Sequence, residues 1–196
     1  MNVILSTRNP SKAEQIKAVF AGVPISVLTL SEAGIEGEAV EDGTTLEENA
    51  MKKAFFAHRP GEWSMADDTG LFIDALDGKP GVYAARWAGE TATTDEITNY
   101  TLKQMEGVAD RSATFKTVVA MVSPEGEQLF FSGEVMGKLL DAPRTRPQPK
   151  MPYSPLFIPE GSDKVWAEMT TDEENAISHR GKAFRLAREY LVGLLS

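Results

Sequence analysis

The sequence predicts an α/β fold, because short apolar runs that suit buried strands alternate with segments whose apolar residues have helical spacing. Residues 3–5 and 27–30 are such runs in the first part of the chain. Residues 113–122 and 128–134 have the pattern of two strands joined by a turn, and the extended pattern continues to residue 140. With 196 residues, of which 42% are hydrophobic, we expect one domain over residues 1–196 with a full core.

Composition excludes several kinds of site and partner. The chain has no cysteine and only two histidines, which excludes disulfides and thiolate metal sites and disfavours zinc. A net charge of −9 argues against a nucleic-acid partner. No run approaches the ~20 apolar residues of a membrane span, and the first residues lack the basic start of a signal peptide. We therefore expect a cytoplasmic protein with a small-molecule partner and without a nucleic-acid or membrane partner.

Two adjacent carboxylates, Asp67 and Asp68, form the centre of the predicted site. Gly70 follows them, and an apolar run comes next at residues 71–73. In a strand the two side chains point to opposite faces, so only one aspartate can face a given cleft. Adjacent carboxylates at the end of a strand suit magnesium binding and general-base chemistry, since hard cations take oxygen ligands. The alternative is a turn with two solvated aspartates, because Asp and Gly are common turn residues.

The polar segment 6–12, between the first strand and the first predicted helix, is a candidate phosphate site. Asn9 suits the N-cap of this helix and Pro10 its first turn. The free N–H groups and the dipole of a helix N-terminus favour an anion such as phosphate. Lys12 stands in the first turn, where the dipole usually favours acids, which indicates a ligand charge nearby. The alternative is an ordinary capped helix, and the P-loop pattern is absent.

A second helix is predicted after a capping box that begins at Thr44 or Thr45. One face of this helix has residues at helical spacing that we expect to be buried: Leu46, Asn49, Ala50, Lys53, Ala54 and Ala57. A buried lysine requires a partner, so Lys53 is predicted to face a carboxylate or a metal-bound phosphate, unless it extends to solvent at the edge of the stripe. Glu41, just before the helix, is either a metal ligand or a surface acid.

The second half of the chain adds a helix after Thr93, a stiff proline-rich loop at 143–155 and a last helix after residues 178–182. The core candidates of the last helix are Phe184, Leu186, Ala187, Tyr190 and Leu191.

Five motifs in this order resemble the inosine triphosphate pyrophosphatase family, the Ham1-like enzymes for noncanonical purine nucleotides. The resemblance spans nearly the whole chain, from residue 3 to about residue 191. Each motif is short, but five of them with the order and spacing of the family form a specific pattern. They occupy residues 6–12, 41–50 with Lys53, 66–71, 80–89 and 177–183.

The resemblance implies an elongated α/β fold with a long, strongly twisted mixed sheet, flanking helices, and two lobes around a central cleft. It also implies a homodimer and the magnesium-dependent hydrolysis of a nucleoside triphosphate to a monophosphate and pyrophosphate. By position, Glu41 and Asp68 would handle Mg²⁺ and the attacking water, with Asp67 in support. The residues that would hold the phosphates are Thr7, Asn9, Lys12, Lys53 and Thr69. Those that would contact the base are Met151, Tyr153, Ser154, Glu174, Ser178, His179 and Arg180.

The chain departs from the family pattern around the base. Where the family has a glycine-rich segment with a phenylalanine and an aspartate, residues 149–155 place Met151 and Ser154. Where the family has a lysine, this chain has Glu174, which either faces the base or completes a capping box with Thr171. These departures leave two alternatives to inosine- or xanthosine-like substrates: the same reaction on a different modified base, or a catalytically weak nucleotide-binding protein.

Overall fold

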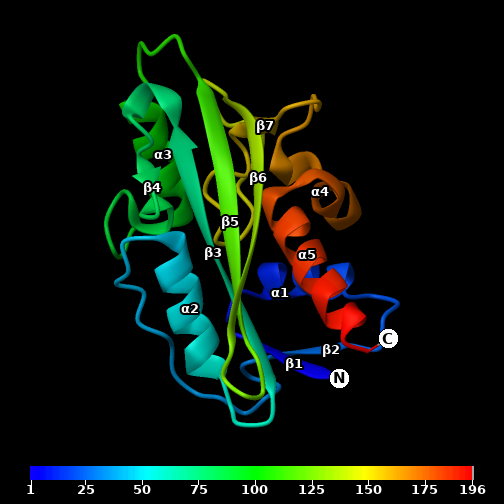
Figure 1. Cartoon of the computed structure of the whole chain (residues 1–196). Coiled ribbons are helices and arrows are strands. Elements are labelled where there is room, and N and C mark those ends of the chain that lie inside the picture. Colours follow the sequence, from blue (N-terminus) through cyan, green and yellow to red (C-terminus); the bar gives the residue numbers. More distant parts are fainter. Residues whose placement is uncertain (196) are drawn as a thin grey trace.

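The computed structural model describes residues 1–195 and confirms the α/β class (Figure 1). One mixed sheet has the strand order β2-β1-β3-β5-β6-β7. The short strand β4 pairs with β3 farther along the edge at which β1 pairs. The pairs β1–β2 and β1–β3 are parallel, and the other pairs are antiparallel. The strands are β1 (Asn2–Leu5), β2 (Ser26–Thr29), β3 (Trp63–Ile73), β4 (Pro80–Gly81), β5 (Ser112–Val122), β6 (Gln128–Leu139) and β7 (Phe157–Pro159).

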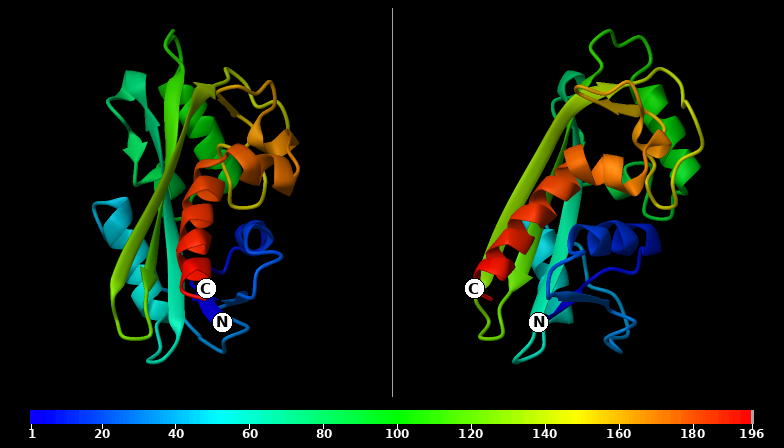
Figure 2. Two further views of the ribbon diagram at one scale, coloured as in Figure 1. Left: turned by 45° about the vertical axis from the view of Figure 1, so that its right-hand side comes forward. Right: turned by 90° about the vertical axis from the view of Figure 1, so that its right-hand side faces the viewer.

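Helices cover both faces of the sheet. The helices are α1 (Pro10–Val19), α2 (Leu46–Ala57), α3 (Thr94–Gln104), α4 (Thr171–Ile177) and α5 (His179–Gly193). Helix α2 packs on β3 and β5, whereas α5 packs against β5 and β6 on the opposite face (Figures 1 and 2). The helix predicted after Thr93 is α3, and it begins with a capping box formed by Thr93 and Glu96. Within residues 1–195, no helix combines the length and apolarity that a bilayer crossing requires.

The molecule is elongated because β3, β5 and β6 run through two lobes that have separate apolar cores (Figure 1). In the first lobe, β1 and α1 pack with the second half of α5 around Ile16, Met65 and Phe184. In the second lobe, α3 and the chain around β7 pack around Met105 and Phe157. The predicted elongated sheet with two lobes is therefore confirmed.

Strand β3 alternates between the two faces of the sheet, and this alternation decides the site. Met65 faces the core of the first lobe, whereas Ala66 faces α2. Continuing the alternation places Asp67 on the α1 and α5 side and Asp68 on the α2 side. The alternative of a turn with two solvated aspartates is wrong, because both residues lie inside β3 and are 2% and 9% exposed.

One edge of β3 is uncovered in its middle. Strand β1 pairs with β3 only as far as the partners Leu5 and Met65, and β4 begins at the partners Gly81 and Leu71. Neither neighbour covers the five residues between, which include both aspartates. This opening in the sheet edge lies where the two lobes meet, and it makes room for a cleft.

One core prediction in α5 is wrong. Leu186 is 46% exposed, because α5 buries the face that carries Phe184, Ala187 and Leu191. A residue two positions after Phe184 points about 200° away from it on a helix with 3.6 residues per turn.

Candidate active site

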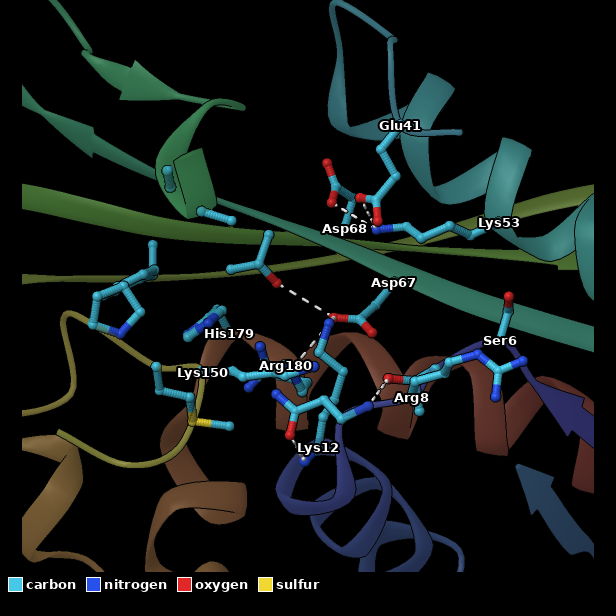
Figure 3. Close-up of a pocket in the computed structure, with 18 of the residues that line it drawn as sticks. Ser6, Arg8, Lys12, Glu41, Lys53, Asp67, Asp68, Lys150, His179 and Arg180 are labelled. Carbon is cyan, nitrogen blue, oxygen red and sulfur yellow. Dashed lines mark hydrogen bonds and ion pairs between the residues drawn. The ribbon is translucent and has the colours of Figure 1, made fainter. Parts of the chain in front are cut away.

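A cavity of about 390 Å³ opens at the uncovered edge of β3. Every residue predicted for the site lines this cavity except Ser178: Thr7, Asn9, Lys12, Glu41, Lys53, Asp67, Asp68, Thr69, Met151, Tyr153, Ser154, Glu174, His179 and Arg180. Figure 3 shows Glu41, Lys53 and Asp68 on one side of β3, and Asp67, Lys12 and Arg180 on the other. The expectation that only one aspartate faces the cleft is wrong, because the cavity reaches around the free strand edge and takes side chains from both faces.

On the α2 side, Lys53 joins two carboxylates. Its Nζ donates to Asp68 Oδ1 at 2.8 Å and to Glu41 Oε2 at 2.7 Å. Asn49 Nδ2 donates to Asp68 Oδ2 at 3.3 Å. The predicted buried stripe of α2 is confirmed with both polar members included. Lys53 is buried and paired, so the alternative that it extends to solvent is wrong.

The loop that carries Glu41 is fixed at both ends. Arg8 donates from Nε to the carbonyl of Gly37 at 2.9 Å and from Nη2 to the carbonyl of Ile35 at 2.9 Å. The N–H of Gly43 donates to Asn49 Oδ1 at 2.8 Å. Arg8 lies next to the predicted phosphate residues, so the same segment orders the acidic loop and one wall of the cavity.

On this side, burial and the charge of the ion-pair partner act in opposite directions on the pKa of each group. Burial raises the pKa of Asp68, the positive charge of Lys53 opposes this, and the charge of Glu41 adds to it, so the pKa remains above its ordinary value. Burial works to lower the pKa of Lys53, but the charges of Asp68 and Glu41 outweigh it and the pKa is raised. Lys53 is therefore a permanent cation, while Asp68 accepts a proton more readily than an ordinary aspartate.

On the α5 side, Asp67 lies between two cations. Its Oδ2 is 3.2 Å from Lys12 Nζ and 3.4 Å from Arg180 Nε. Burial works to raise the pKa of Asp67, but the charges of Lys12 and Arg180 hold the pKa below its ordinary value. Thr69 also donates to this oxygen at 3.4 Å. Asp67 therefore stays ionised and orients the cations that face the cavity.

The N-terminus of α1 opens onto the same cavity. Asn9 is the N-cap as predicted, and its Oδ1 accepts from the N–H groups of Ser11 at 3.1 Å and Lys12 at 3.3 Å. Thr7 Oγ1 accepts from the N–H of Asn9 at 3.2 Å, which fixes the preceding turn. Because α1 carries no acidic residue in its first turn, its positive end is available to an anion.

The other end of the cavity is aromatic. The ring of His179 stacks on Phe115 with centroids 4.7 Å apart and planes inclined by 13°, and Trp166 lies 6.0 Å from the same ring. Burial, together with the charge of Arg180, lowers the pKa of His179 well below its ordinary value, so the imidazole is neutral. Among residues 1–195, Trp166 Nε1 and His179 Nδ1 are buried without a hydrogen-bond partner. Flat walls with unused polar atoms suit a planar heterocycle.

The proline-rich loop forms one wall at this end and is held by its own side chains. Ser154 Oγ accepts from the N–H of Gln148 at 2.9 Å and donates to the carbonyl of Met151 at 2.8 Å. Tyr153 donates from its hydroxyl to the carbonyl of Ala84 at 2.8 Å. The hydroxyls of Ser154 and Tyr153 therefore shape the wall, and the side chain of Met151 is left to face the cavity.

Glu174 lies on α4 and faces the cavity. It is 5% exposed, and the capping box at the start of α4 is formed by Thr170 and Glu173. The alternative that Glu174 completes a capping box with Thr171 is therefore wrong. Burial raises the pKa of Glu174, while the charge of Arg180 and a hydrogen bond with Gln15 oppose this shift.

Ser178 has a structural place instead of one in the cavity wall. It is the N-cap of α5, where its Oγ accepts from the N–H of Gly181 at 2.9 Å. Sequence reasoning missed some wall residues. Phe115 and Trp166 lie outside the five motifs and gave no recognisable signal, because their role depends on distant neighbours. Ser6, Arg8 and Lys150 also line the cavity, and they lie in segments that were singled out although no role was assigned to these three residues.

The cavity offers some, but not all, of the oxygen ligands that a hard divalent cation requires. Among residues 1–195, no group of three or more acidic or histidine side chains is arranged to hold a metal ion. Glu41 and Asp68 both approach Lys53, so their carboxylates converge on a position that a cation occupies. Mg²⁺ commonly uses one or two carboxylates together with waters and substrate phosphates, so these two residues fit that ion in a complex with a phosphate ligand.

Comparison with known proteins gives the family. A model described as the Ham1 family matches residues 3–190. The chain belongs to the Ham1 family. This membership confirms the family that the five motifs resemble.

Similar proteins cover the chain almost completely. The dITP/XTP pyrophosphatase of Thermoanaerobacter pseudethanolicus is 42% identical over 98% of this Ham1-family chain and 97% of its own length. That of Geobacter sulfurreducens is 41% identical over 96% of both chains. Among solved structures, the Ham1 protein of Staphylococcus aureus has a TM-score of 0.83 at 31% identity, covering 98% of this chain and 99% of its own. The HAM1 protein of Coxiella burnetii has a TM-score of 0.84 at the same identity and coverage.

Proposed function

We propose that this Ham1-family protein is a magnesium-dependent pyrophosphohydrolase that cleaves a noncanonical nucleoside triphosphate into a monophosphate and pyrophosphate. Its relatives carry the name dITP/XTP pyrophosphatase, and the chain is accordingly an enzyme of the nucleoside triphosphate pyrophosphatase class. Inosine and xanthosine triphosphates are the first substrates to test, because they match the names of these relatives.

The observation that carries the proposal is the convergence of carboxylates and cations on one cavity. Lys53 lies between Glu41 and Asp68, while Lys12 and Arg180 flank a third carboxylate. Phosphoryl transfer depends mainly on positioning and charge neutralisation, which such a set supplies. A pocket without a charged ligand gains little from so many buried ions, because each has a desolvation cost.

The residues divide into distinct proposed roles. Asp68 orients the attacking water and accepts its proton, which its raised pKa favours. Glu41 and Asp68 would hold Mg²⁺, whose charge stabilises the phosphate oxygens when it is bound. Asp67 positions Lys12 and Arg180. The remaining phosphate contacts are assigned to Thr7, Asn9, Lys53 and Thr69.

The aromatic end of the cavity is proposed to bind the base of the nucleotide. His179 supplies a neutral stacked ring, and Arg180 joins this end to Asp67. Met151 offers an adaptable apolar contact from the proline-rich loop. Tyr153 and Ser154 act through the shape of the loop, because their hydroxyls are already bonded to backbone.

The direct test is product analysis with and without Mg²⁺. Purified protein incubated with inosine triphosphate should release pyrophosphate and inosine monophosphate in equal amounts, and chelation of Mg²⁺ should stop the reaction. Release of orthophosphate and a diphosphate would show cleavage at the other anhydride and contradict the proposal. Tight nucleotide binding without products would instead favour the alternative of a catalytically weak binding protein.

The protein is further proposed to act as a cytoplasmic homodimer without a nucleic-acid partner. The net charge of −9 supports the last point, because nucleic-acid surfaces attract basic proteins. A dimer is supported by large apolar side chains that are exposed, such as Phe130 and Met136 on β6. Light scattering on the eluting protein should give twice the chain mass of 21.4 kDa, and the monomer mass would refute the dimer.

A further inference from the structure

We propose that Lys150 selects 6-oxopurine bases by donating a hydrogen bond from the cavity wall to their carbonyl oxygen. The inference rests on the proposed nucleotide hydrolysis and assigns a residue that determines specificity within it. Hypoxanthine and xanthine carry this oxygen, whereas adenine carries an amino group at the same place. Lys150 thus helps to separate inosine and xanthosine triphosphates from adenosine triphosphate.

Lys150 occupies a turn position that glycine normally takes. The N–H of Met151 donates to the carbonyl of Gln148 at 3.0 Å, which closes a turn with Pro149 second and Lys150 third. The φ of Lys150 is 59°, in the left-handed region that is strained for a residue with a side chain and not for glycine. A turn with proline second and a positive φ at the third position favours glycine or asparagine there. The turn therefore does not account for a lysine, and residues strained in this way cluster at functional sites.

The loop holds this turn at the aromatic end of the cavity. The hydroxyl of Ser154 bonds both ends of the turn, accepting from one N–H and donating to one carbonyl. The adjacent ring of Tyr153 lies 6.0 Å from the ring of Phe115, which stacks on His179. Lys150 lines the cavity next to these anchors, so it borders the part that is proposed to bind the base.

The ammonium group of Lys150 is available to a ligand. Among residues 1–195, five lysines and arginines line the cavity, and the other four bond carboxylates or backbone carbonyls. Lys150 has no hydrogen-bond or ion-pair partner within the same residues. Figure 3 shows it on the same side of β3 as His179 and Arg180. Because an ammonium can only donate, it can bond a carbonyl oxygen of the base but gains nothing from an amino group.

The first test compares two substrates that differ at one edge of the base. With Mg²⁺, Lys150→Met should lower the ratio of kcat/KM for inosine triphosphate to that for adenosine triphosphate by about fivefold, which is the effect of a charged contact at an exposed site. Methionine keeps most of the side-chain length and removes the charge. An unchanged ratio would overturn the inference. So would an equal fall for both substrates, because it would assign Lys150 to the phosphates.

The variant Lys150→Gly separates selection from stability. Its melting temperature should rise by about 2 °C, because glycine adopts the positive φ without strain. The substrate ratio should nevertheless fall as it does in Lys150→Met. A melting temperature below that of the parent would show that the lysine stabilises the turn, and it would overturn the inference.

Arg146→Met is the matched control. Arg146 lies in the same proline-rich loop and is exposed, but it does not line the cavity. This variant removes the same charge, so the substrate ratio should stay at the parent value. An equal fall of the ratio in Arg146→Met and Lys150→Met would show a general effect of charge and overturn the inference.

Binding separates this inference from the proposed reaction. Calorimetry with inosine and adenosine monophosphates measures base selection without turnover, and the preference for inosine monophosphate should shrink in Lys150→Met. Absence of pyrophosphate from every triphosphate would refute the proposed function, while the monophosphate affinities would still decide the role of Lys150. Equal affinity of the parent for both monophosphates, or binding of neither, would overturn the inference.

Discussion

Asp67 and Asp68 are neighbours in sequence, but their surroundings shift their pKa values in opposite directions. Lys12 and Arg180 hold the pKa of Asp67 below its ordinary value, whereas burial dominates at Asp68 and its pKa is raised. Two carboxylates whose environments separate their pKa values usually have separate roles. Asp67 is suited to orient cations, and Asp68 is suited to accept a proton.

The single substitution Asp68→Asn should lower kcat by ~10²–10⁴-fold, because an amide cannot accept the proton of the attacking water. The fold should persist, since Asn keeps the shape of Asp and Lys53 retains Glu41 as a partner. Steady-state kinetics and circular dichroism on the same preparation measure both effects. Parent-level turnover in a folded variant would remove Asp68 from the mechanism.

The two aspartates should also act oppositely on stability in metal-free protein. The folded pKa of Asp67 is depressed, so its contribution is present above the unfolded value, about 4, and is lost as pH falls through the folded pKa. The folded pKa of Asp68 is raised, so its ionised form lowers stability at neutral pH, and this loss is recovered as pH falls through the folded pKa and is fully recovered at the unfolded value.

Denaturant unfolding at a series of pH values checks these signs. Asp67→Asn should flatten the loss of unfolding free energy below about pH 4. Asp68→Asn should instead remove a gain of unfolding free energy that the parent shows as pH falls through the raised folded pKa toward about 4. Identical pH profiles in both variants would show that the two carboxylates do not differ in their folded pKa values.

Among the elements, the contact of α5 with β6 sets the position of His179 and Arg180. Helix α5 passes so close to β6 that the space beside Gly133 is filled by backbone. A Cβ built on Gly133 would collide with the carbonyl oxygen of His179 and would lie 2.7 Å from the N–H nitrogen of Ala183. Glycine is therefore required at this position for steric reasons and not for a special φ.

Gly133→Ala should lower the free energy of unfolding by about 1–3 kcal/mol, since the added methyl group meets rigid backbone. It should also weaken nucleotide binding, because α5 must move together with its first residue, His179. Gly193→Ala is the control: nothing lies within 4 Å of its Cβ position near the end of α5, so stability should hold or rise slightly. Equal stability of the two variants would refute the close packing.

Over the whole molecule, the site joins segments that are distant in sequence. Lys12 comes from the first lobe, Glu41 from the loop before α2, and Glu174 from α4. Arg8 and Asn49 connect the acidic loop to the rest of the cavity through hydrogen bonds. The proposed nucleotide would therefore contact both lobes at once, and we expect it to stabilise the complete fold.

Glu41→Gln should raise the Mg²⁺ concentration required for half-maximal activity, because an amide oxygen is a weaker ligand for a hard cation than a carboxylate. The melting temperature without ligand should change little, while the increase produced by nucleotide with Mg²⁺ should shrink. Activity titrations and thermal melts with and without Mg²⁺ measure both effects. A parent-like Mg²⁺ titration would argue against ligation by Glu41.

Local chemistry made several features predictable. Asn9 and Pro10 determined the start of α1, the spacing of Leu46, Ala50 and Ala54 determined the buried face of α2, and the five motifs indicated the family. These signals act over one or two turns of chain, where caps, side-chain direction and helical period are properties of the sequence itself.

Tertiary structure decided the rest. The register of β1 and β4 leaves the edge of β3 free, and only this opening lets Asp67 and Asp68 share one cavity. The direction of α4 sends Glu174 into the cavity, whereas Ser178, in an equally suggestive motif, caps α5 instead. The sequence by itself determined the residue types and the elements that carry them. Their partners, burial and pKa values depend on other segments, which come together only when the sheet and helices pack; among residues 1–195, Arg180 and Asp67 are the widest-separated ion pair, 113 residues apart.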